Sequence, residues 1–510
     1  MKAVVVDADL LDSTKDTIVL LDLEGAEKSR QWLSQKSKDV ADQLGRAIES
    51  GDFKAKEGQM VLLYTKGRIS VERVVVAGLG KKEEFKLQKV RVAVAGVVNA
   101  LRLTGVKELA FPVDSSTCGP HTSIQDEGSY CRSVVESAFL SHYKYDVHKT
   151  EKEASGLHSI ILAAKGKVKE LSPTVRFASV VCSHALLARD LINTGASDKP
   201  PKMIAEYAKK RAGRSVKVTP IFKKELERLG AGGILAVNKG SINEPCLLVM
   251  EYNAGSSAGK RGIPTVALVG KGIVFDAGGL DIKPASGMET MKVDMNGAAA
   301  VIHAALAAAE LDLPVHVVAI SALTENLLGP QAYKPGDFVK TMSGKTVEIL
   351  NTDAEGRMVL ADALHFAKSF KPDYLIDIAT LTGACWVALG GEAAGLFCNN
   401  PLFSDSLVKA GEETYERVWP MPLFDEYGEL MKSDFADLKN VVSNGPSGGG
   451  AITAAKFLEH WVDKKQKWAH LDIAGVDWME AEKDFRPRGA TGFGVRLLTR
   501  FLADLAVKGK

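Results

Sequence analysis

The 510-residue sequence predicts an α/β protein with a smaller N-terminal α/β domain and a larger C-terminal α/β catalytic domain built on a central mixed β-sheet. Three observations support this fold class. The length exceeds that of one typical domain core. Short Val- and Ile-rich segments alternate with longer helical patterns, as in α/β folds. Hydrophobic residues form 46% of the chain, which is enough to bury large cores.

The first part of the chain contains five strand-like segments separated by helical patterns. The expected strands are Ala3–Val6, Ile18–Leu21, Val61–Tyr64, Val74–Val76 and Glu108–Val113. Helices are expected over Ser29–Glu49 and Leu87–Leu103. Gly78 and Gly80 follow a strand, but the rest of a dinucleotide-binding fingerprint is missing, so nucleotide binding is not predicted.

The N-terminal domain is expected to end in a polar stretch, Tyr143–Gly156, and a Lys-rich turn near Lys165–Lys169. The helical pattern Ala178–Ile192 then leads into the second domain. We therefore predict an N-terminal domain over residues 1–172, a linking helix over 173–195 and a catalytic domain over 196–510.

The second domain continues the alternation of strands and helices. Its expected strands are Thr265–Val269, Val315–Ile320 and Tyr374–Ile378, and its expected helices are Gly297–Glu310, Ala354–Ser369 and Ala451–Trp461. The last helix follows a Gly-, Ser- and Pro-rich loop at Asn444–Gly450, a composition typical of a connection.

Composition argues against several functional classes. The net charge is +2 and no long basic run occurs, so nothing demands a nucleic acid or an anionic membrane as a partner. Six cysteines without CxxC spacing indicate reduced thiols and a cytoplasmic setting. Asp7 interrupts the N-terminal apolar run too early for a signal peptide. The longest apolar segments, near Met295–Ala309 and Ile378–Gly391, are too short to cross a membrane.

Charged residues gather in segments that are otherwise apolar. The sequence NTDAEGR at Asn351–Arg357 contributes two carboxylates and a guanidinium, and the segments upstream of it contribute two lysines and two aspartates. The acids are Asp276, Asp294, Asp353 and Glu355, and the basic residues are Lys271, Lys283 and Arg357. Two divalent cations a few ångströms apart require shared anionic ligands, so this set predicts a two-metal hydrolase site.

The local spacing suggests how the ligands are presented. Asp353 and Glu355 can face one pocket from extended backbone, whereas on a helix they would diverge by about 200°, so a strand end or loop is expected. Gly278 and Gly279 permit the unusual dihedral angles that a ligand-bearing loop often needs. Lys271, if desolvated beside a metal, could lose its proton and donate nitrogen.

Each residue alone has a simpler structural explanation. Asp294 and Asn296 could cap the helix Gly297–Glu310, and Asp353 could cap the following one with Glu355 in its first turn. The basic residues could be solvated or paired with these acids. The combination favours a metal site, because buried carboxylates without cationic partners are costly in free energy.

Further motifs carry a family resemblance. They are KPGD at Lys334–Asp337, ATLTGA at Ala379–Ala384, GGAITAA at Gly449–Ala455 and WAHLDIAG at Trp468–Gly475. Together with NTDAEGR, they make the chain from about Arg189 to its end similar to the M17 family of leucyl aminopeptidases, or cytosol aminopeptidases. These are cytosolic exopeptidases with two metals in each subunit.

The resemblance implies a role for each residue of the site. Lys271, Asp276, Asp294 and Glu355 would hold one metal, and Asp276, Asp353 and Glu355 the other. Lys283 would polarise the scissile carbonyl, and Arg357 would hold a bicarbonate that takes a proton from the attacking water. Met291, Thr380 and Gly383 would line the pocket for the first residue of the substrate. Peptides with a free N-terminus are the implied substrates, and a homohexamer of two trimers is the implied assembly.

The sequence departs from the family pattern at Val274, Ala277, Asp281 and Asn296, and again at Gly195–Ser197. None of these residues is an implied metal ligand. Asp281 lies two residues from Lys283 and could favour the charged form of that lysine.

Three questions stay open at this stage. No HExxH spacing occurs, and carboxylate and amine ligands suit Mn, Zn, Mg or Co without choosing among them. We take Mn or Zn as the first candidates, with Mg or Co as further ones. The carboxylates alone would also suit a two-metal phosphoesterase. A hexameric scaffold or DNA-binding protein is a third reading, although the near-neutral charge argues against strong general affinity for nucleic acid.

Overall fold

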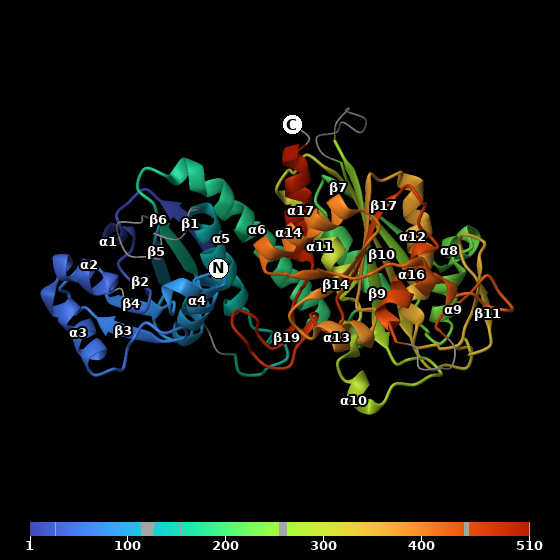
Figure 1. The fold of residues 1–510 in the computed structure, drawn as a ribbon, viewed down its shortest axis with the longest axis horizontal. Coiled ribbons are helices and arrows are strands. Elements are labelled where there is room, and N and C mark those ends of the chain that lie inside the picture. The colour runs from blue at the N-terminus through green and yellow to red at the C-terminus, as the bar shows by residue number, and fades with distance from the viewer. Residues whose placement is uncertain (26, 114–126, 153–154, 254–262, 443–447, 509–510) are drawn as a thin grey trace. The chain divides into compact units, whose positions relative to one another are not determined.

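The computed structural model describes the chain except for residues 26, 114–126, 153–154, 254–262, 443–447 and 509–510 (Figure 1). Cys118 and most of the predicted loop Asn444–Gly450 therefore lie outside the described residues. The chain forms two compact units. The first contains Met1–Ser183 and Glu480–Arg488, and the second contains His184–Met479 and Gly489–Lys510. The predicted combination of two α/β domains is confirmed.

The first unit is built on a six-stranded mixed sheet with strand order β1-β6-β5-β2-β4-β3. Its strands are β1 (Lys2–Val6), β2 (Thr17–Asp22), β3 (Met60–Tyr64), β4 (Arg73–Gly78), β5 (Glu108–Pro112) and β6 (Ser159–Ala163). The first five match the predicted strands within two residues, whereas β6 was not predicted. Only β3 runs antiparallel to its neighbour, so the sheet is otherwise parallel.

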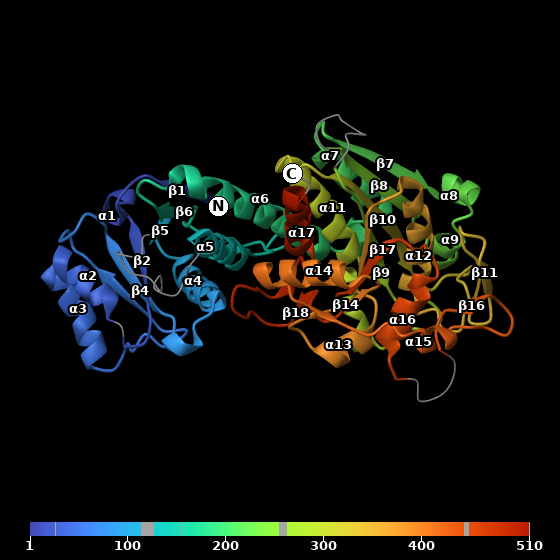
Figure 2. The ribbon, with the colours of Figure 1, turned by 45° about the horizontal axis from the view of Figure 1, so that its top comes forward.

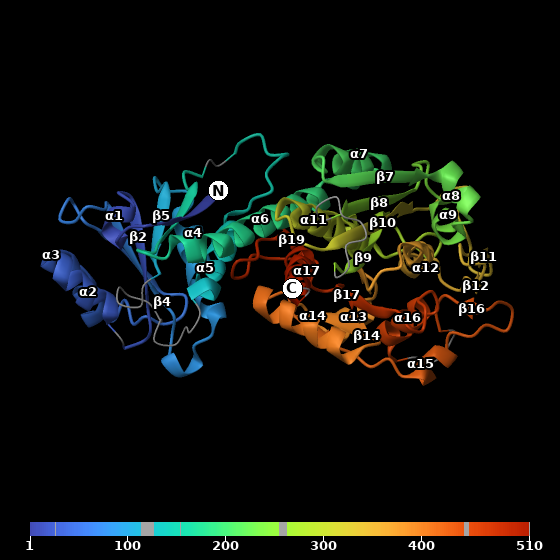
Figure 3. The same ribbon diagram turned by 90° about the horizontal axis from the view of Figure 1, so that it is seen from above.

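Helices cover both faces of this sheet (Figure 3). The larger ones are α2 (Lys28–Lys36), α3 (Lys38–Glu49), α4 (Leu87–Leu101) and α5 (Glu127–His142). The predicted single helix Ser29–Glu49 is in fact two, because Ser37 adopts extended backbone with φ −158° and ψ 114°. The break lets α2 and α3 pack against each other and place Trp32, Leu33 and Leu44 on one apolar core.

The first unit also contains a short segment from much later in the chain. Residues 480–488 come back to it from the second unit. Glu482 accepts a hydrogen bond of 2.6 Å from the Asn99 side chain and lies 3.6 Å from the Arg102 guanidinium, so this segment is fixed on α4 and the residue after it.

The second unit is built on an eight-stranded mixed sheet with strand order β15-β14-β17-β13-β9-β10-β8-β7. The strands are β7 (Val216–Phe222), β8 (Cys246–Asn253), β9 (Thr265–Asp276), β10 (His316–Asn326), β13 (Tyr374–Ala379), β14 (Ala394–Cys398), β15 (Val418–Pro420) and β17 (Lys467–Asp472). Figure 2 shows part of this order, from β7 through β8 and β10 to β9. The predicted central mixed sheet is confirmed, but its strands β9 and β10 run six or seven residues further than predicted.

Two layers of helices cover this sheet (Figure 3). One layer contains α11 (Asn296–Glu310), α14 (Pro401–Thr414) and α17 (Val495–Lys508), and the other contains α9 (Gly232–Asn238), α12 (Glu355–Ala367) and α16 (Gly450–Glu459). The Ala-rich helix α11, which is buried from Asn296 to Ala309, lies very close to the sheet. A Cβ atom on Gly297 would lie 2.1 Å from the Ile378 carbonyl oxygen, so only glycine fits there.

The smaller elements complete the fold. The short helices are α1 (Leu10–Ser13), α7 (Pro201–Arg211), α8 (Lys223–Leu229), α10 (Ala285–Met288), α13 (Gly383–Leu389) and α15 (Asp425–Glu429). The short strands are β11 (Phe338–Lys340), β12 (Thr346–Glu348), β16 (Leu438–Lys439), β18 (Trp478–Met479) and β19 (Gly489–Ala490). Helix α6 (Val168–Asn193) starts five residues before the predicted linking helix, 173–195, and contains the boundary between the units.

Helix α6 also passes a length and composition test for a membrane span. Its most apolar 18-residue window has a mean hydropathy of 1.2. This segment was predicted as the linking helix and not as one of the longest apolar segments. Half of that window is buried inside the protein, and core helices of globular proteins pass the same test.

The five cysteines in the described part of the chain are all free thiols, as predicted.

Candidate metal centre

The candidate site lies at one edge of the eight-stranded sheet. Strands β17, β13, β9 and β10 are parallel neighbours, so their carboxyl ends meet at the same edge. Asp276 ends β9 beside Asn326, which ends β10, and Asp472 ends β17 beside Ala379, which ends β13. Ligand sites of open α/β sheets form outside such strand ends.

Three of the predicted ligands meet directly. Carboxylate oxygens of Asp276, Asp353 and Glu355 lie within 4.8 Å of one another. Asp353 occupies a turn and Glu355 is the first residue of α12, so the expected strand end or loop is wrong for Glu355. The Asp353 and Glu355 side chains still converge, because Asp353 lies before the helix. The rotation of about 100° per residue within a helix therefore does not separate them.

Two lysines lie among these carboxylates. The Lys271 Nζ atom is 2.8 Å from Asp294 Oδ1 and 2.9 Å from Glu355 Oε1. The Lys283 Nζ atom is 2.9 Å from Asp276 Oδ2 and 2.6 Å from Asp353 Oδ1. All five predicted metal ligands and one predicted catalytic lysine are therefore brought together.

The electrostatics follow from this burial and pairing. Burial raises the pKa values of Asp294, Asp353 and Glu355, and the Asp276 carboxylate adds to the effect. Burial alone would lower the pKa of Lys271, but Asp294, Glu355 and Asp276 outweigh it and raise that pKa. The Lys271 and Lys283 side chains are thus ammonium groups paired with the acids of the cluster, since the carboxylates around Lys283 raise its pKa as well.

The donor set fits two divalent cations. Asp294 Oδ2 and Glu355 Oε2 are buried and have no hydrogen-bond partner among the described residues. Such orphaned anionic oxygens are costly unless a cation coordinates them. Carboxylate oxygens are the hard ligands that divalent cations of this kind accept.

The capping explanations fail for these acids. Met295 occupies the N-cap position of α11 and Ala354 that of α12, and neither helix has a side-chain cap. Asp294 and Asp353 are therefore not helix caps. Asn296 is fully buried in the first turn of α11, and neither polar atom of its side chain has a partner in the described part of the chain.

The loop that follows β9 needs both of its glycines. Gly278 has φ +88° and Gly279 has φ +70°, a region that other residues seldom adopt. A Cβ atom on Gly278 would lie 2.4 Å from the Asp281 carbonyl oxygen. The Asp281 carboxylate accepts hydrogen bonds from the Thr352 backbone N–H at 2.7 Å and from its hydroxyl, so it ties this loop to the NTDAEGR segment.

The remaining predicted residues lie around this centre. The Thr380 hydroxyl donates a 2.7 Å hydrogen bond to Asp294, and its carbonyl oxygen accepts one of 2.9 Å from Lys271. Met291 is partly buried just before Asp294, and Gly383 is the exposed first residue of α13. Thr380 contacts the metal cluster directly, and the Met291 carbonyl oxygen accepts a 3.4 Å hydrogen bond from the Asp294 backbone N–H, whereas no contact of Gly383 with the cluster is observed among the described residues.

Arg357 faces the other side of the NTDAEGR segment. Its Nη1 atom donates a 2.5 Å hydrogen bond to the Asn440 carbonyl oxygen, and its guanidinium lies 5.9 Å from the Phe457 ring centroid. Burial lowers the pKa of Arg357 to about 10. The Nε atom is buried without a partner in the described residues, which leaves one donor for an anion.

Several supporting residues were not predicted. Asn326 donates hydrogen bonds to Asp276 Oδ1 at 2.8 Å and to the Thr352 carbonyl at 3.1 Å. The Asn440 side chain accepts from Leu350 and Asn351 and donates to the Asn351 carbonyl, so it holds the loop that carries Asp353. A single polar residue far away in the sequence gives no periodic signal by which these contacts could be found.

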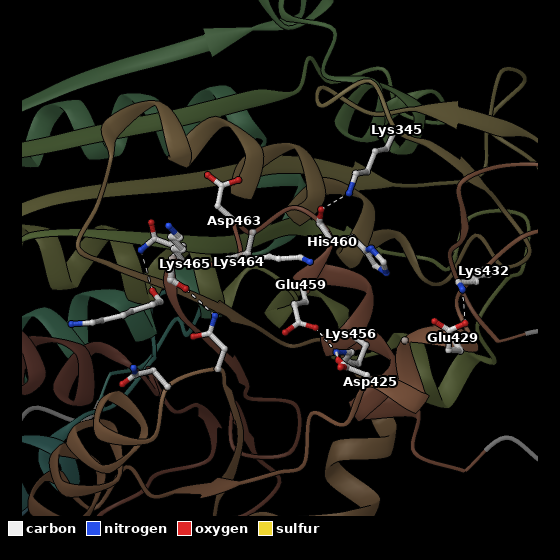
Figure 4. Close-up of a pocket in the computed structure, with 16 residues that line it drawn as sticks. Lys345, Asp425, Glu429, Lys432, Lys456, Glu459, His460, Asp463, Lys464 and Lys465 are labelled. Carbon is white, nitrogen blue, oxygen red and sulfur yellow. Dashed lines mark hydrogen bonds and ion pairs between the residues drawn. The ribbon is translucent and has the colours of Figure 1, made fainter.

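A separate cavity lies away from these residues. It has a volume of about 830 Å³ and is lined mainly by charged residues, none of which is a predicted site residue (Figure 4). Lys456 lies 3.1 Å from Asp425 and also pairs with Glu459, and Lys432 pairs with Glu429. This hollow is a surface of paired charges. At the metal centre, Lys271 and Lys283 fill the space between the acids, so volume does not locate it.

Comparison with protein families decides between a peptidase and a phosphoesterase. A model described as the cytosol aminopeptidase family, catalytic domain, matches residues 186–499, and one described as the N-terminal domain of that family matches residues 18–152. The chain belongs to the cytosol aminopeptidase family. It is thus a peptidase, and the phosphoesterase reading is not supported.

Relatives agree over most of the chain. A protein named probable cytosol aminopeptidase from Geobacter sulfurreducens is 44% identical over 463 residues, covering 90% of each chain. One with the same name from Roseiflexus castenholzii is 40% identical over 510 residues, covering 99% of each. Among solved structures, the bottromycin maturation enzyme BotP in complex with Mn is 30% identical with a TM-score of 0.82, covering 97% of this chain and 100% of its own.

Gly356 of the NTDAEGR segment makes room for Lys271. A Cβ atom on Gly356 would lie 2.5 Å from Lys271 Cε and 2.8 Å from its Nζ. Alanine is favoured over glycine in helices by about 1 kcal/mol, but Lys271 is buried and can move only by leaving its partners. We expect Gly356→Ala to lower peptidase activity by about 10²-fold through misplacement of the site. Steady-state hydrolysis of a dipeptide would measure this loss.

The matched control is Gly96→Ala on α4, where an added Cβ meets nothing within 4 Å. That variant should keep full activity and gain thermal stability. Full activity in Gly356→Ala would contradict the packing argument.

A buried ion pair beneath the site predicts a pH effect on stability. The Asp377 and His470 side chains are both fully buried and 2.5 Å apart. Burial alone would lower the pKa of His470, but Asp377 outweighs it and raises that pKa above 6.5. The contribution of the pair is thus complete below pH 6.5 and disappears as the pH rises through the folded-state pKa.

Denaturant unfolding between about pH 6 and about pH 9 tests this linkage. The loss of unfolding free energy with rising pH should be smaller in His470→Gln than in the native protein. Exposed His158 supplies the control, since His158→Gln should keep the native slope. An unchanged slope in His470→Gln would rule the linkage out.

Proposed function

We propose that the protein is a cytoplasmic two-metal leucyl aminopeptidase that removes N-terminal, preferably Leu-like, residues from peptides. The observation that carries this proposal is the convergence of Asp276, Asp353 and Glu355 within 4.8 Å, with two orphaned carboxylate oxygens beside them. The Mn named for the related BotP structure supports metal dependence. Mn or Zn are the first candidates for this chain, with Mg and Co as further ones.

The residues would share the work as follows. Lys271, which would have to lose its proton to donate nitrogen, would hold one cation together with Asp276, Asp294 and Glu355. Asp276, Asp353 and Glu355 would hold the other. When bound, such a pair lowers the pKa of a water and polarises a carbonyl. Lys283 would stabilise the negative charge that grows on the substrate oxygen, where a positioned charge has a large effect on rate.

The surroundings would orient the substrate and accept the proton. Arg357 has a buried Nε–H without a partner in the described residues, which suits a bicarbonate able to take the proton from the attacking water. Thr380, Met291 and Gly383 would line the pocket for the first side chain. A homohexamer remains a further proposal that rests on the family resemblance.

The decisive experiment compares Leu-p-nitroanilide with its N-acetyl derivative. Metal-stripped protein would be supplied separately with Mn, Zn, Co or Mg. Metal-dependent cleavage of the free-amine substrate alone would support the proposal and rank the metals. Absence of cleavage with every metal would overturn it. A salt-sensitive DNA complex that survives Asp353→Asn would then favour the DNA-binding alternative.

A further inference from the structure

Asp472 occupies a place where several backbone donors converge. It is the last residue of β17, lies beside Ala379 at the end of β13, and is fully buried. Its Oδ1 atom accepts hydrogen bonds from the backbone N–H groups of Leu381 at 3.1 Å, Thr382 at 3.3 Å and Ala474 at 3.2 Å. Its Oδ2 atom accepts one of 2.6 Å from the Thr382 hydroxyl.

These bonds fix the segment that leaves β13. Thr382 in turn caps helix α13, because its hydroxyl oxygen accepts a 3.0 Å hydrogen bond from the Cys385 N–H. Both ends of the short connection between β13 and α13 are therefore held by one carboxylate and the threonine that it binds. Multiple backbone donors also compensate for the burial of the charge.

The same segment reaches the metal centre one residue earlier. Thr380 accepts the Lys271 ammonium on its carbonyl oxygen and donates its hydroxyl to Asp294 Oδ1, at 2.9 and 2.7 Å. A shift of residues 381 and 382 would move both contacts. Partners outside the first layer of ligands often set the affinity of a metal site, and their loss typically costs 10- to 100-fold.

We propose that Asp472 is a positioning residue for the metal centre, acting through the backbone of Leu381 and Thr382 on Thr380 and thereby on Lys271 and Asp294. This inference rests on the proposed two-metal function. It assigns a role to Asp472, the aspartate of the WAHLDIAG motif. This residue does not itself contact the predicted metal ligands among the described contacts.

Mn²⁺ binding to the full-length, metal-stripped protein tests the proposal without relying on activity. The free Mn²⁺ signal in electron paramagnetic resonance gives the affinity. Asp472→Ala should bind Mn²⁺ about 10- to 100-fold more weakly than the native protein. Asp472→Asn, which keeps one acceptor oxygen for the backbone donors, should lie between the two.

Two comparisons separate positioning from general damage. Asp362 is equally buried and accepts backbone N–H groups of Ile234 and Met342 at 2.9 and 2.7 Å, and no hydrogen bond or ion pair joins it to the centre in the described part of the chain. Asp362→Asn should lower the melting temperature and keep native Mn²⁺ affinity. Thr380→Val removes the hydroxyl contact with Asp294 but keeps the carbonyl contact with Lys271, so combining it with Asp472→Ala should weaken binding by less than the product of the two single losses.

Native affinity in folded Asp472→Ala, or fully multiplicative losses in the double variant, would overturn the inference. If Asp472→Ala fails to fold, native affinity in folded Asp472→Asn would overturn it equally. Failure of the native protein itself to bind Mn²⁺ would instead count against the proposed function, so the two outcomes are distinguishable.

Discussion

Glu355→Gln is expected to abolish metal-dependent peptidase activity. Glu355 is only 1% exposed, one of its oxygens lies 2.9 Å from Lys271, and the other has no partner among the described residues. An amide keeps the shape of the side chain but removes the charge that a shared ligand supplies. Loss of several kcal/mol of transition-state stabilisation corresponds to a decrease of about 10³-fold or more.

In the absence of metal, Glu355→Gln should not destabilise the protein. Burial and the Asp276 carboxylate raise the pKa of Glu355, so its ionised form is unfavourable there. Scanning calorimetry should show that Mn²⁺ raises the melting temperature of the native protein but not that of Glu355→Gln. Exposed Glu426 on α15 provides the control, because Glu426→Gln should keep both activity and the Mn²⁺ effect. Native activity in Glu355→Gln would show that Glu355 is not a metal ligand.

Lys283→Met is expected to reduce kcat by about 10²- to 10³-fold with a much smaller change in KM. The Lys283 side chain is 17% exposed and lies at the open side of the cluster, where it can reach a substrate oxygen. Its charge matters most when negative charge has developed, so binding of the uncharged carbonyl should suffer little.

Saturating metal must be present in this measurement, since Lys283 also contacts the carboxylates of Asp276 and Asp353. Steady-state kinetics on Leu-p-nitroanilide would give both constants. Lys340→Met on β11 is the matched control, because this lysine is exposed and distant in the fold from the cluster's ligands. A raised KM with native kcat would show that Lys283 serves binding instead.

The sequence predicted those features that have a local signal. Strands such as β2 and β4 are continuous apolar runs, and α11 and α12 are long periodic segments, so both were found within a few residues. The break at Ser37 was missed because the apolar pattern continues across it. Strands β7, β8 and β17 were not predicted as strands, although all but the first residue of β17 belongs to the recognised motif WAHLDIAG.

The residues of the site also differ in whether they have a local sequence signal. The acids and lysines were found because charged residues in apolar segments are conspicuous. Asn440 and Asn326 were not found, because their importance depends on contacts across 26 to 90 residues of chain. The suggested effect of Asp281 on Lys283 also needed coordinates, which place the Asp281 carboxylate against Thr352.

The return of residues 480–488 to the first unit limits how the chain can be divided. A fragment that stops at Ser183 would lack Glu482, the partner of Asn99 and Arg102. The complementary fragment would carry that segment with no surface to receive it. The two units are therefore not interchangeable modules. A gene that shuffled either one as a continuous piece would encode an incomplete fold, so the pair is expected to be inherited together.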